Sequence, residues 1–165
     1  MGLMNSSSVS RVVLKPVSSP PERRPRRTPD DALVESLTEH LVDQLEARQP
    51  SLRGAFVRLA RCYHSDAPAL GYGVRGMDAT SGSLRFDFAV FVVTDDTPLH
   101  IIYEHVERHL LAGASLIWVL NPRMCQVIVT TPTQTQDFGM DGILDGGEVL
   151  ADLALPVRDI FAASS

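Results

Sequence analysis

Hydrophobic residues are most concentrated between Asp87 and Pro122, where their spacing changes twice. Residues 88–93 form an unbroken apolar run rich in β-branched and aromatic side chains, as in a strand buried on both faces. After an acidic turn, apolar positions recur at helical spacing, and Gly113 suits the left-handed conformation that ends a helix. Residues 116–120 then form a second apolar run. This order predicts a strand–helix–strand unit, and therefore a sheet that is at least partly parallel.

Weaker patterns precede this unit. Leucines recur every fourth residue from Leu33 to Leu45, which predicts an amphipathic helix over residues 31–48 that packs on the sheet. Residues 56–63 fit a short helix or a strand equally well. The glycines of segment 71–76 lack the strand-to-helix context of a phosphate-binding loop, so they predict a turn or hairpin.

The region after Pro122 alternates between apolar and polar stretches. Residues 125–130 predict a strand that pairs with the preceding one through a short turn. Residues 131–142 are polar and predict a loop, and residues 144–150 predict a short turn. A final helical turn is expected to end at Phe161.

Charge divides the chain into two parts. Residues 1–30 are rich in Ser, Pro and Arg and hold six basic and two acidic residues, which predicts a disordered basic tail. The rest holds nine basic and eighteen acidic residues, and residues 31–161 are expected to form a single domain. An acidic domain repels a phosphate backbone, so any contact with DNA is expected through the tail.

Composition also indicates the compartment. No apolar run approaches the length of a membrane span, and residues 1–10 lack the apolar core of a secretory signal, so we expect a cytoplasmic protein without membrane contact. Cys62 and Cys125 occur singly in apolar surroundings, which predicts two reduced, buried thiols.

The last third of the chain carries several motifs that occur together in one protein family. They are Gly113, Trp118, the pair Asn121-Pro122, and the segments 144–150 and 155–161. With these motifs the chain resembles the Uma2-type (DUF820) restriction-endonuclease family over roughly residues 84–161, and the helix expected at 31–48 fits that family's early helix. The resemblance implies an α/β fold with a restriction-endonuclease-like, PD-(D/E)xK core, in which helices flank a mixed β-sheet.

The resemblance also implies where catalytic residues would lie. Such nucleases hold Mg²⁺ with two carboxylates and use a lysine to orient or activate the attacking water. Aligned without gaps to the family's acidic strand, the sequence places Phe91 at the position of the glutamate and His105 at that of the lysine. The family's earlier aspartate has no clear match, and Asp66 and Asp78 are weak candidates for it. Since the only lysine of the chain is Lys15, the implied catalytic site is degenerate.

Three side chains could still form a rearranged site. Asp87 and Asp95 could ligate a cation, and His105 could act as a base because an imidazole titrates near neutral pH. Each also has a plainer interpretation. Asp87 suits a capped loop, Asp95 and Asp96 suit a solvated turn and helix N-cap, and His109 beside His105 suits a core position.

Two functions follow from these observations. The first is a Uma2-like domain that has lost nuclease activity and acts as an interaction or structural module, with no cofactor and with a homodimer as one expected assembly. The second is an active Mg²⁺-dependent DNA endonuclease with a rearranged site around Asp87, Asp95 and His105, in which the two aspartates hold the metal. The two functions differ in whether these side chains converge on one pocket, or whether Phe91 fills the place of the metal.

Overall fold

The computed structural model describes residues 29–59, 68–77, 84–95 and 97–162. Several sequence predictions fall outside these ranges and stay predictions. They concern the basic tail up to residue 28, Cys62, Asp66, Asp78 and Asp96.

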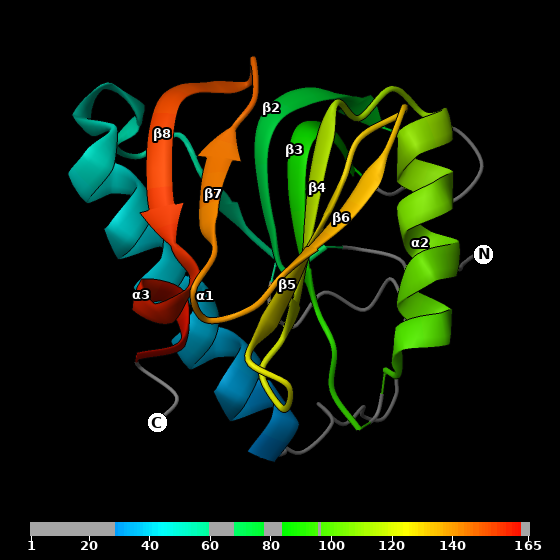
Figure 1. Cartoon of the computed structure of the whole chain (residues 1–165). Helices are drawn as coiled ribbons and strands as arrows, with labels where there is room; N and C mark the ends of the chain where they lie inside the picture. Colours follow the sequence, from blue (N-terminus) through cyan, green and yellow to red (C-terminus); the bar gives the residue numbers. More distant parts are fainter. Residues whose placement is uncertain (1–28, 60–67, 78–83, 96, 163–165) are drawn as a thin grey trace, which may run out of the picture.

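A six-stranded mixed sheet forms the centre of the molecule (Figure 1). Its strands follow one another across the sheet in chain order: β1 (Val57–Arg58), β2 (Leu70–Met77), β3 (Leu84–Val92), β4 (Leu116–Asn121), β5 (Gln126–Thr130) and β6 (Thr135–Phe138). β3 and β4 are parallel, and every other neighbouring pair is antiparallel. The predicted strand–helix–strand unit and the mixed sheet are therefore confirmed.

Helices and a small hairpin cover the two faces of this sheet (Figure 1). Helix α2 (Leu99–Leu111) links β3 to β4 and packs on one face. The other face is covered by α1 (Pro29–Arg48), by the hairpin of β7 (Ile143–Gly146) and β8 (Leu150–Pro156), and by α3 (Val157–Phe161). A short 3₁₀ turn, η2 (Pro50–Leu52), follows α1. Among the described residues, no helix is long and apolar enough to cross a membrane.

Two apolar clusters explain why these elements form layers. The central strands are buried on both faces, so alternate side chains enter opposite clusters. Toward α2, Ala89 and Phe91 pack with Ile102 and Val106. Toward α1, the larger cluster includes Phe88 and Trp118, together with residues of the β7–β8 hairpin and α3.

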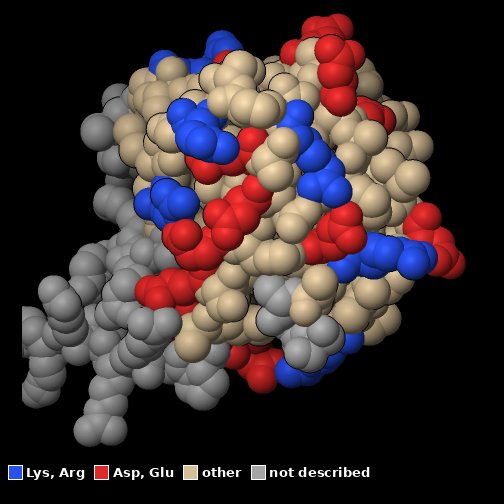
Figure 2. Space-filling view, turned by 90° about the vertical axis from the view of Figure 1, so that its left-hand side faces the viewer, with Lys and Arg blue, Asp and Glu red and all other residues tan. Residues whose placement is uncertain are grey.

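Polar contacts fix α1 against the C-terminal elements. Arg48 Nη2 lies 2.9 Å from Asp159 Oδ2, and the Arg48 Nε donates to the Ala154 carbonyl. His40 Nε2 lies 2.6 Å from the Asp159 carbonyl oxygen. Figure 2 shows that acidic and basic side chains are interspersed over this side of the molecule, and so the described domain presents no single-sign field there.

The structure resolves or corrects four local predictions. Gly71, Gly73 and Gly76 lie within strand β2, which pairs antiparallel with the next strand β3, so the hairpin alternative holds for this segment and the turn does not. The turn predicted within residues 144–150 is present as the turn of the β7–β8 hairpin, whereas the segment expected to be a polar loop contains β6. Cys125 is free but only half-buried.

Candidate functional site

Asp87 lies near the start of β3, where its carboxylate is paired with a cation of the same sheet. Arg75 Nη1 on β2 donates a hydrogen bond to Asp87 Oδ1 over 2.7 Å. The two side chains are 48% and 36% exposed, respectively, so solvent screens the pair and its contribution to stability is small. Its importance is chemical, because the guanidinium already neutralises the carboxylate that was predicted to bind a metal.

The ion pair between Arg75 and Asp87 occupies space that is open because two neighbouring residues are glycines without side chains. A Cβ on Gly73 would lie 2.7 Å from Asp87 Oδ2, and a Cβ on Gly113 would lie 3.1 Å from Arg75 Nε. Both glycines have positive φ, +75° and +111°, which other residues adopt only with strain. Because Gly113 follows the C-terminus of α2, Arg75 also lies near the negative end of that helix dipole. Backbone geometry therefore places Arg75 between β3 and α2.

Replacing Gly73 by alanine tests this arrangement. The added methyl group meets both a strained φ and the Asp87 carboxylate, so we expect the free energy of unfolding to fall by about 1–3 kcal/mol in urea denaturation. Gly54→Ala is the matched control, because Gly54 has φ +82° but no atom within 4 Å of the added Cβ. Equal losses of unfolding free energy in the two variants would show that the collision with Asp87 adds nothing to the cost of Gly73→Ala.

Asp87 also borders a cavity of about 630 Å³ between the sheet and the β7–β8 turn. Its walls present hydroxyl groups, one amide and a second carboxylate. The polar lining residues are Tyr72, Asp87, Ser115, Thr131, Thr133, Gln134 and Glu148. The cavity therefore has polar walls with an excess of negative charge once Arg75 has paired with Asp87.

Asp95 lies beyond the opposite end of β3. Its Oδ1 accepts a hydrogen bond from Arg123 Nη2, and both residues line a separate cavity of about 470 Å³. The predicted role of Asp95 in a helix N-cap is wrong, because the N-cap of α2 is Pro98 and it makes no side-chain capping hydrogen bond. The other role predicted for Asp95, in a solvated turn, agrees with its place in a bend where its side chain is 67% exposed.

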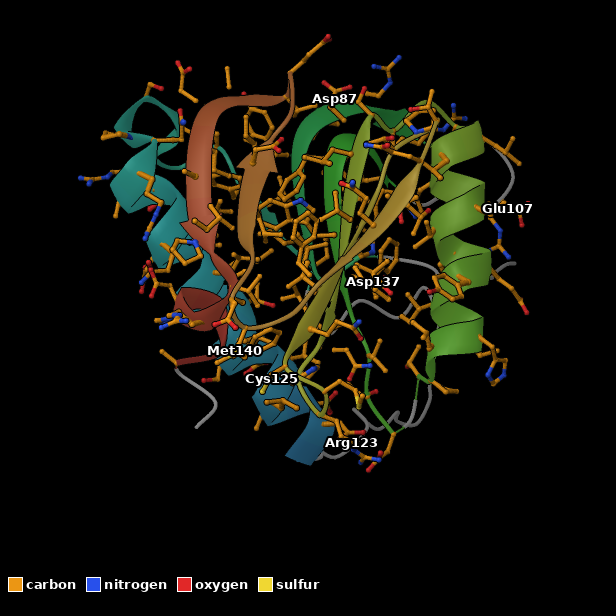
Figure 3. All side chains as sticks on the ribbon, in the orientation of Figure 1. Asp87, Glu107, Arg123, Cys125, Asp137 and Met140 are labelled. Atoms are coloured by element: carbon orange, nitrogen blue, oxygen red, sulfur yellow. The ribbon has the colours of Figure 1, made fainter. Side chains whose placement is uncertain are left out.

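The structure does not bring Asp87 and Asp95 together. An extended chain rises about 3.3 Å per residue, so the strand from Asp87 to Val92 alone separates them by roughly 16 Å. Figure 3 shows Asp87 at one end of the sheet and Arg123, the partner of Asp95, at the other. Since carboxylate oxygens ligate Mg²⁺ at about 2 Å, the two aspartates cannot hold the same ion.

His105 belongs to the interior of the domain rather than to either cavity. It is 6% exposed on α2, and its ring centroid lies 6.1 Å from that of Phe91. His109, one turn further along, is 5% exposed and meets the same ring edge-to-face at 5.3 Å. Phe91 is itself 2% exposed in the apolar cluster under α2. The described structure therefore places both imidazoles against the Phe91 ring in the interior of the domain. This agrees with the core position predicted for His109. It does not support the role of His105 as a base, because a base must reach the substrate.

These positions allow a test of whether the residues present fit a magnesium ion. Within the described ranges, no group of three or more His, Cys, Asp or Glu side chains gathers where it could hold a metal. Asp87 pairs with Arg75, and the position of the second family carboxylate is an aromatic core residue. The three residues proposed from sequence for a rearranged site, Asp87, Asp95 and His105, therefore do not assemble a Mg²⁺ ligand set, whereas Asp87 and Glu148 are two carboxylates that line one cavity.

Sequence reasoning did not identify Arg75 or Glu148 as parts of this region. Arg75 lies in the glycine-rich segment for which the sequence predicts a turn or hairpin, and this pattern does not indicate which residue of β3 Arg75 contacts. The alternation of Tyr72 and Val74 around Gly73 was the available signal for a strand. Nothing in the sequence indicates that Glu148 lies near Asp87, because Asp87 is part of the six-stranded sheet and Glu148 lies in the turn of the β7–β8 hairpin.

Comparison with known proteins agrees with this architecture. A scan against protein-family models found no match, and a search of curated proteins found none. Among solved structures, the chain is similar to a "putative nuclease belonging to DUF820" from Anabaena variabilis, with a TM-score of 0.60 and 14% sequence identity. The match covers 78% of this chain and 80% of the other.

The described domain therefore has a nuclease-like α/β fold, a mixed sheet flanked by helices. The solved structure comes from DUF820, the family that the sequence motifs resemble. At this level of identity the likeness concerns the fold, and the chemistry of the site has to be argued from its own residues.

Proposed function

We propose that this protein is a nuclease-fold domain that has lost nuclease activity and acts as an interaction or structural module. The proposal starts from the two catalytic positions that the family resemblance assigns. The glutamate position is Phe91 and the lysine position is His105. Neither replacement preserves the chemistry, because a phenyl ring cannot ligate a hard cation and the imidazole is buried.

The burial of Phe91 is the observation that carries this proposal. Its ring is 2% exposed and packs with Ile102 and Val106 of α2 in the apolar cluster. A carboxylate at this position would have to enter a hydrophobic interior, which is costly unless a partner compensates its charge. The position has therefore become part of the packing between the sheet and α2.

The charge around Asp87 supports the same conclusion. Arg75 provides the positive charge that a metal ion would otherwise provide at this carboxylate. The chain also has no lysine other than Lys15, and arginine cannot replace a lysine that activates water, because it stays protonated.

One observation favours the alternative of an active Mg²⁺-dependent endonuclease. Asp87 and Glu148 line the same polar cavity, so two carboxylates face one solvent-filled space. A rearranged site of this kind would have to use Glu148 in place of Asp95, which lines a different cavity.

A plasmid-nicking assay with the full chain distinguishes the two functions. We expect wild-type protein in Mg²⁺ or Mn²⁺ to leave supercoiled plasmid unchanged, at the level of the Asp87→Ala variant. Glu148→Gln serves as a second variant, because it removes the only other carboxylate of the cavity. Nicking by the wild type that is lost in Asp87→Ala or Glu148→Gln would overturn the proposal and place a rearranged site in this cavity.

A further inference from the structure

β6 forms one edge of the six-stranded sheet. It pairs with β5 through four residue pairs, from Val127–Phe138 to Thr130–Thr135, and within the described residues no strand pairs with its other side. Thr135, Gln136 and Asp137 are all exposed, whereas Phe138 packs partly against the core. The edge is therefore accessible along three consecutive residues.

The hydrogen-bond pattern of the β5–β6 hairpin identifies which backbone groups point outward. The Thr131 amide donates to the Gln134 carbonyl over 2.9 Å, so these two residues form a hydrogen-bonded pair at the turn. In an antiparallel ladder such pairs alternate with non-hydrogen-bonded pairs. Gln136 therefore bonds to Val129 of β5, while the N–H and C=O groups of Thr135 and Asp137 point away from the sheet.

This edge has only part of the protection that usually prevents strand addition. Exposed edges in natural proteins are commonly blocked by charged side chains, especially lysine, by proline, by a bulge or by a very short strand. β6 is four residues long with one exposed charge, Asp137, but it contains neither lysine nor proline, and its pairing with β5 has no register shift. The opposite edge, β1, consists of only two residues. β6 is thus the edge of the described sheet that is open to pairing.

We propose that β6 binds β6 of a second copy of this chain, in antiparallel orientation, so that the two sheets become continuous. A residue whose N–H and C=O groups point away from β5 must lie opposite a residue of the second copy whose groups also point outward. This requirement restricts the possible registers between the two β6 strands. With Gln136 opposite Gln136 of the second copy, Thr135 lies opposite Asp137 on both sides of the two-fold axis. One neighbouring register would place Asp137 directly opposite its own copy, and like charges facing each other across strands are destabilising. The other would place Thr135 opposite its own copy and Asp137 opposite Thr133, which lies outside β6.

Self-complementarity is the reason for choosing a second copy as the occupant. In the favoured register every outward N–H of Thr135 and Asp137 meets an outward C=O of the other copy, and the two Gln136 amides can hydrogen-bond with each other. This inference goes beyond the proposed function and does not depend on metal binding at Asp87. The dimerisation assay and the nicking assay can therefore fail separately.

The test is analytical ultracentrifugation of the full chain over a range of concentrations. We expect a monomer–dimer equilibrium in the wild type and a dissociation constant raised by roughly tenfold or more in Asp137→Pro, because each copy loses an intermolecular hydrogen bond. Proline is tolerated where the lost N–H points out of an edge strand, so the hairpin should persist. Asp137→Asn, which keeps the N–H, is the matched control and should dimerise like the wild type.

A second measurement keeps the proposal testable if Asp137→Pro does not fold. Amide hydrogen exchange of the wild type should become slower at Thr135 and Asp137 as protein concentration rises, with no such change at Gln136, whose amide already bonds to β5. A chain that is monomeric at all concentrations would overturn the proposal. So would a dimer in which Asp137→Pro has no effect, because its interface would then lie elsewhere.

Discussion

Replacing Phe91 by glutamate is expected to unfold the domain or to leave it barely stable. Deleting a buried phenylalanine costs about 3–5 kcal/mol, and burying a carboxylate adds several kcal/mol more unless the imidazoles of His105 and His109 beside this position compensate its charge. The sum approaches the roughly 5–15 kcal/mol that stabilises a typical domain. The side chain has little room to escape, because Phe91 is 2% exposed beneath α2. Far-UV circular dichroism with urea denaturation measures the loss.

The same variant would restore the glutamate that the family resemblance expects at this position. Phe91→Leu is its control, since a smaller apolar side chain keeps the site hydrophobic and should cost only about 1.5 kcal/mol or less. If the position still belonged to a metal site, Mg²⁺ would bind the glutamate variant and raise its melting temperature by linkage. A folded Phe91→Glu variant that Mg²⁺ stabilises would contradict the interpretation of Phe91 as a core residue.

Trp118 is expected to show the second large effect. Its indole is fully buried on the α1 side of the sheet and meets the Phe88 ring edge-to-face, with centroids 5.0 Å apart. Trp118→Ala should reduce the free energy of unfolding by about 3–5 kcal/mol. Leu111→Ala, at a side chain that is 85% exposed, should stay within about 0.5 kcal/mol of the wild type. Urea denaturation monitored by circular dichroism compares them.

Trp118→Phe separates packing from hydrogen bonding at the same position. The Trp118 Nε1 atom is buried without a hydrogen-bond partner in the described structure, and an unpaired buried donor costs about 1–3 kcal/mol. Phenylalanine removes that donor while keeping most of the apolar contact, so we expect a loss of about 1.5 kcal/mol or less. A loss as large as that of Trp118→Ala would show that the indole nitrogen contributes a stabilising contact.

The central fold could be predicted from sequence because burial leaves a strong pattern there. Phe88 to Val92 and Leu116 to Leu120 are buried on both faces, so they appear as unbroken apolar runs, and α2 shows its helical period between them. β6 leaves no such pattern, because Thr135, Gln136 and Asp137 are exposed and polar. Its pairing with β5 comes from backbone hydrogen bonds, which side-chain patterns do not reveal.

For a related reason the sequence left a turn and a hairpin open for the glycines of β2. Glycine in a strand usually signals a break, yet here Gly71 and Gly73 lie where a Cβ would collide with Phe86 and Asp87 of β3. That requirement depends on the cross-strand register and on the irregularity between Val74 and Gly76. Neither is visible in a single sequence.

The candidate site could be predicted only in part. The sequence predicts that Phe91 and His105 depart from the family pattern, and the structure shows that both side chains are buried. The pairing of Asp87 with Arg75 depends on contacts between strands and was missed. The separation of Asp87 from Asp95 follows from strand length, since one lies near the start of β3 and the other beyond its end.

Metal binding at Asp87 tests the central claim most directly. Isothermal titration calorimetry of the full chain with Mg²⁺ and with Mn²⁺ should be compared with that of Asp87→Ala. The Asp43→Ala variant controls for loss of an exposed carboxylate on α1. We predict the same weak, unsaturable heats in all three proteins, because Arg75 already neutralises Asp87 and the family resemblance puts the buried Phe91 at the position of the second carboxylate. A saturable site that disappears in Asp87→Ala and persists in Asp43→Ala would contradict this account.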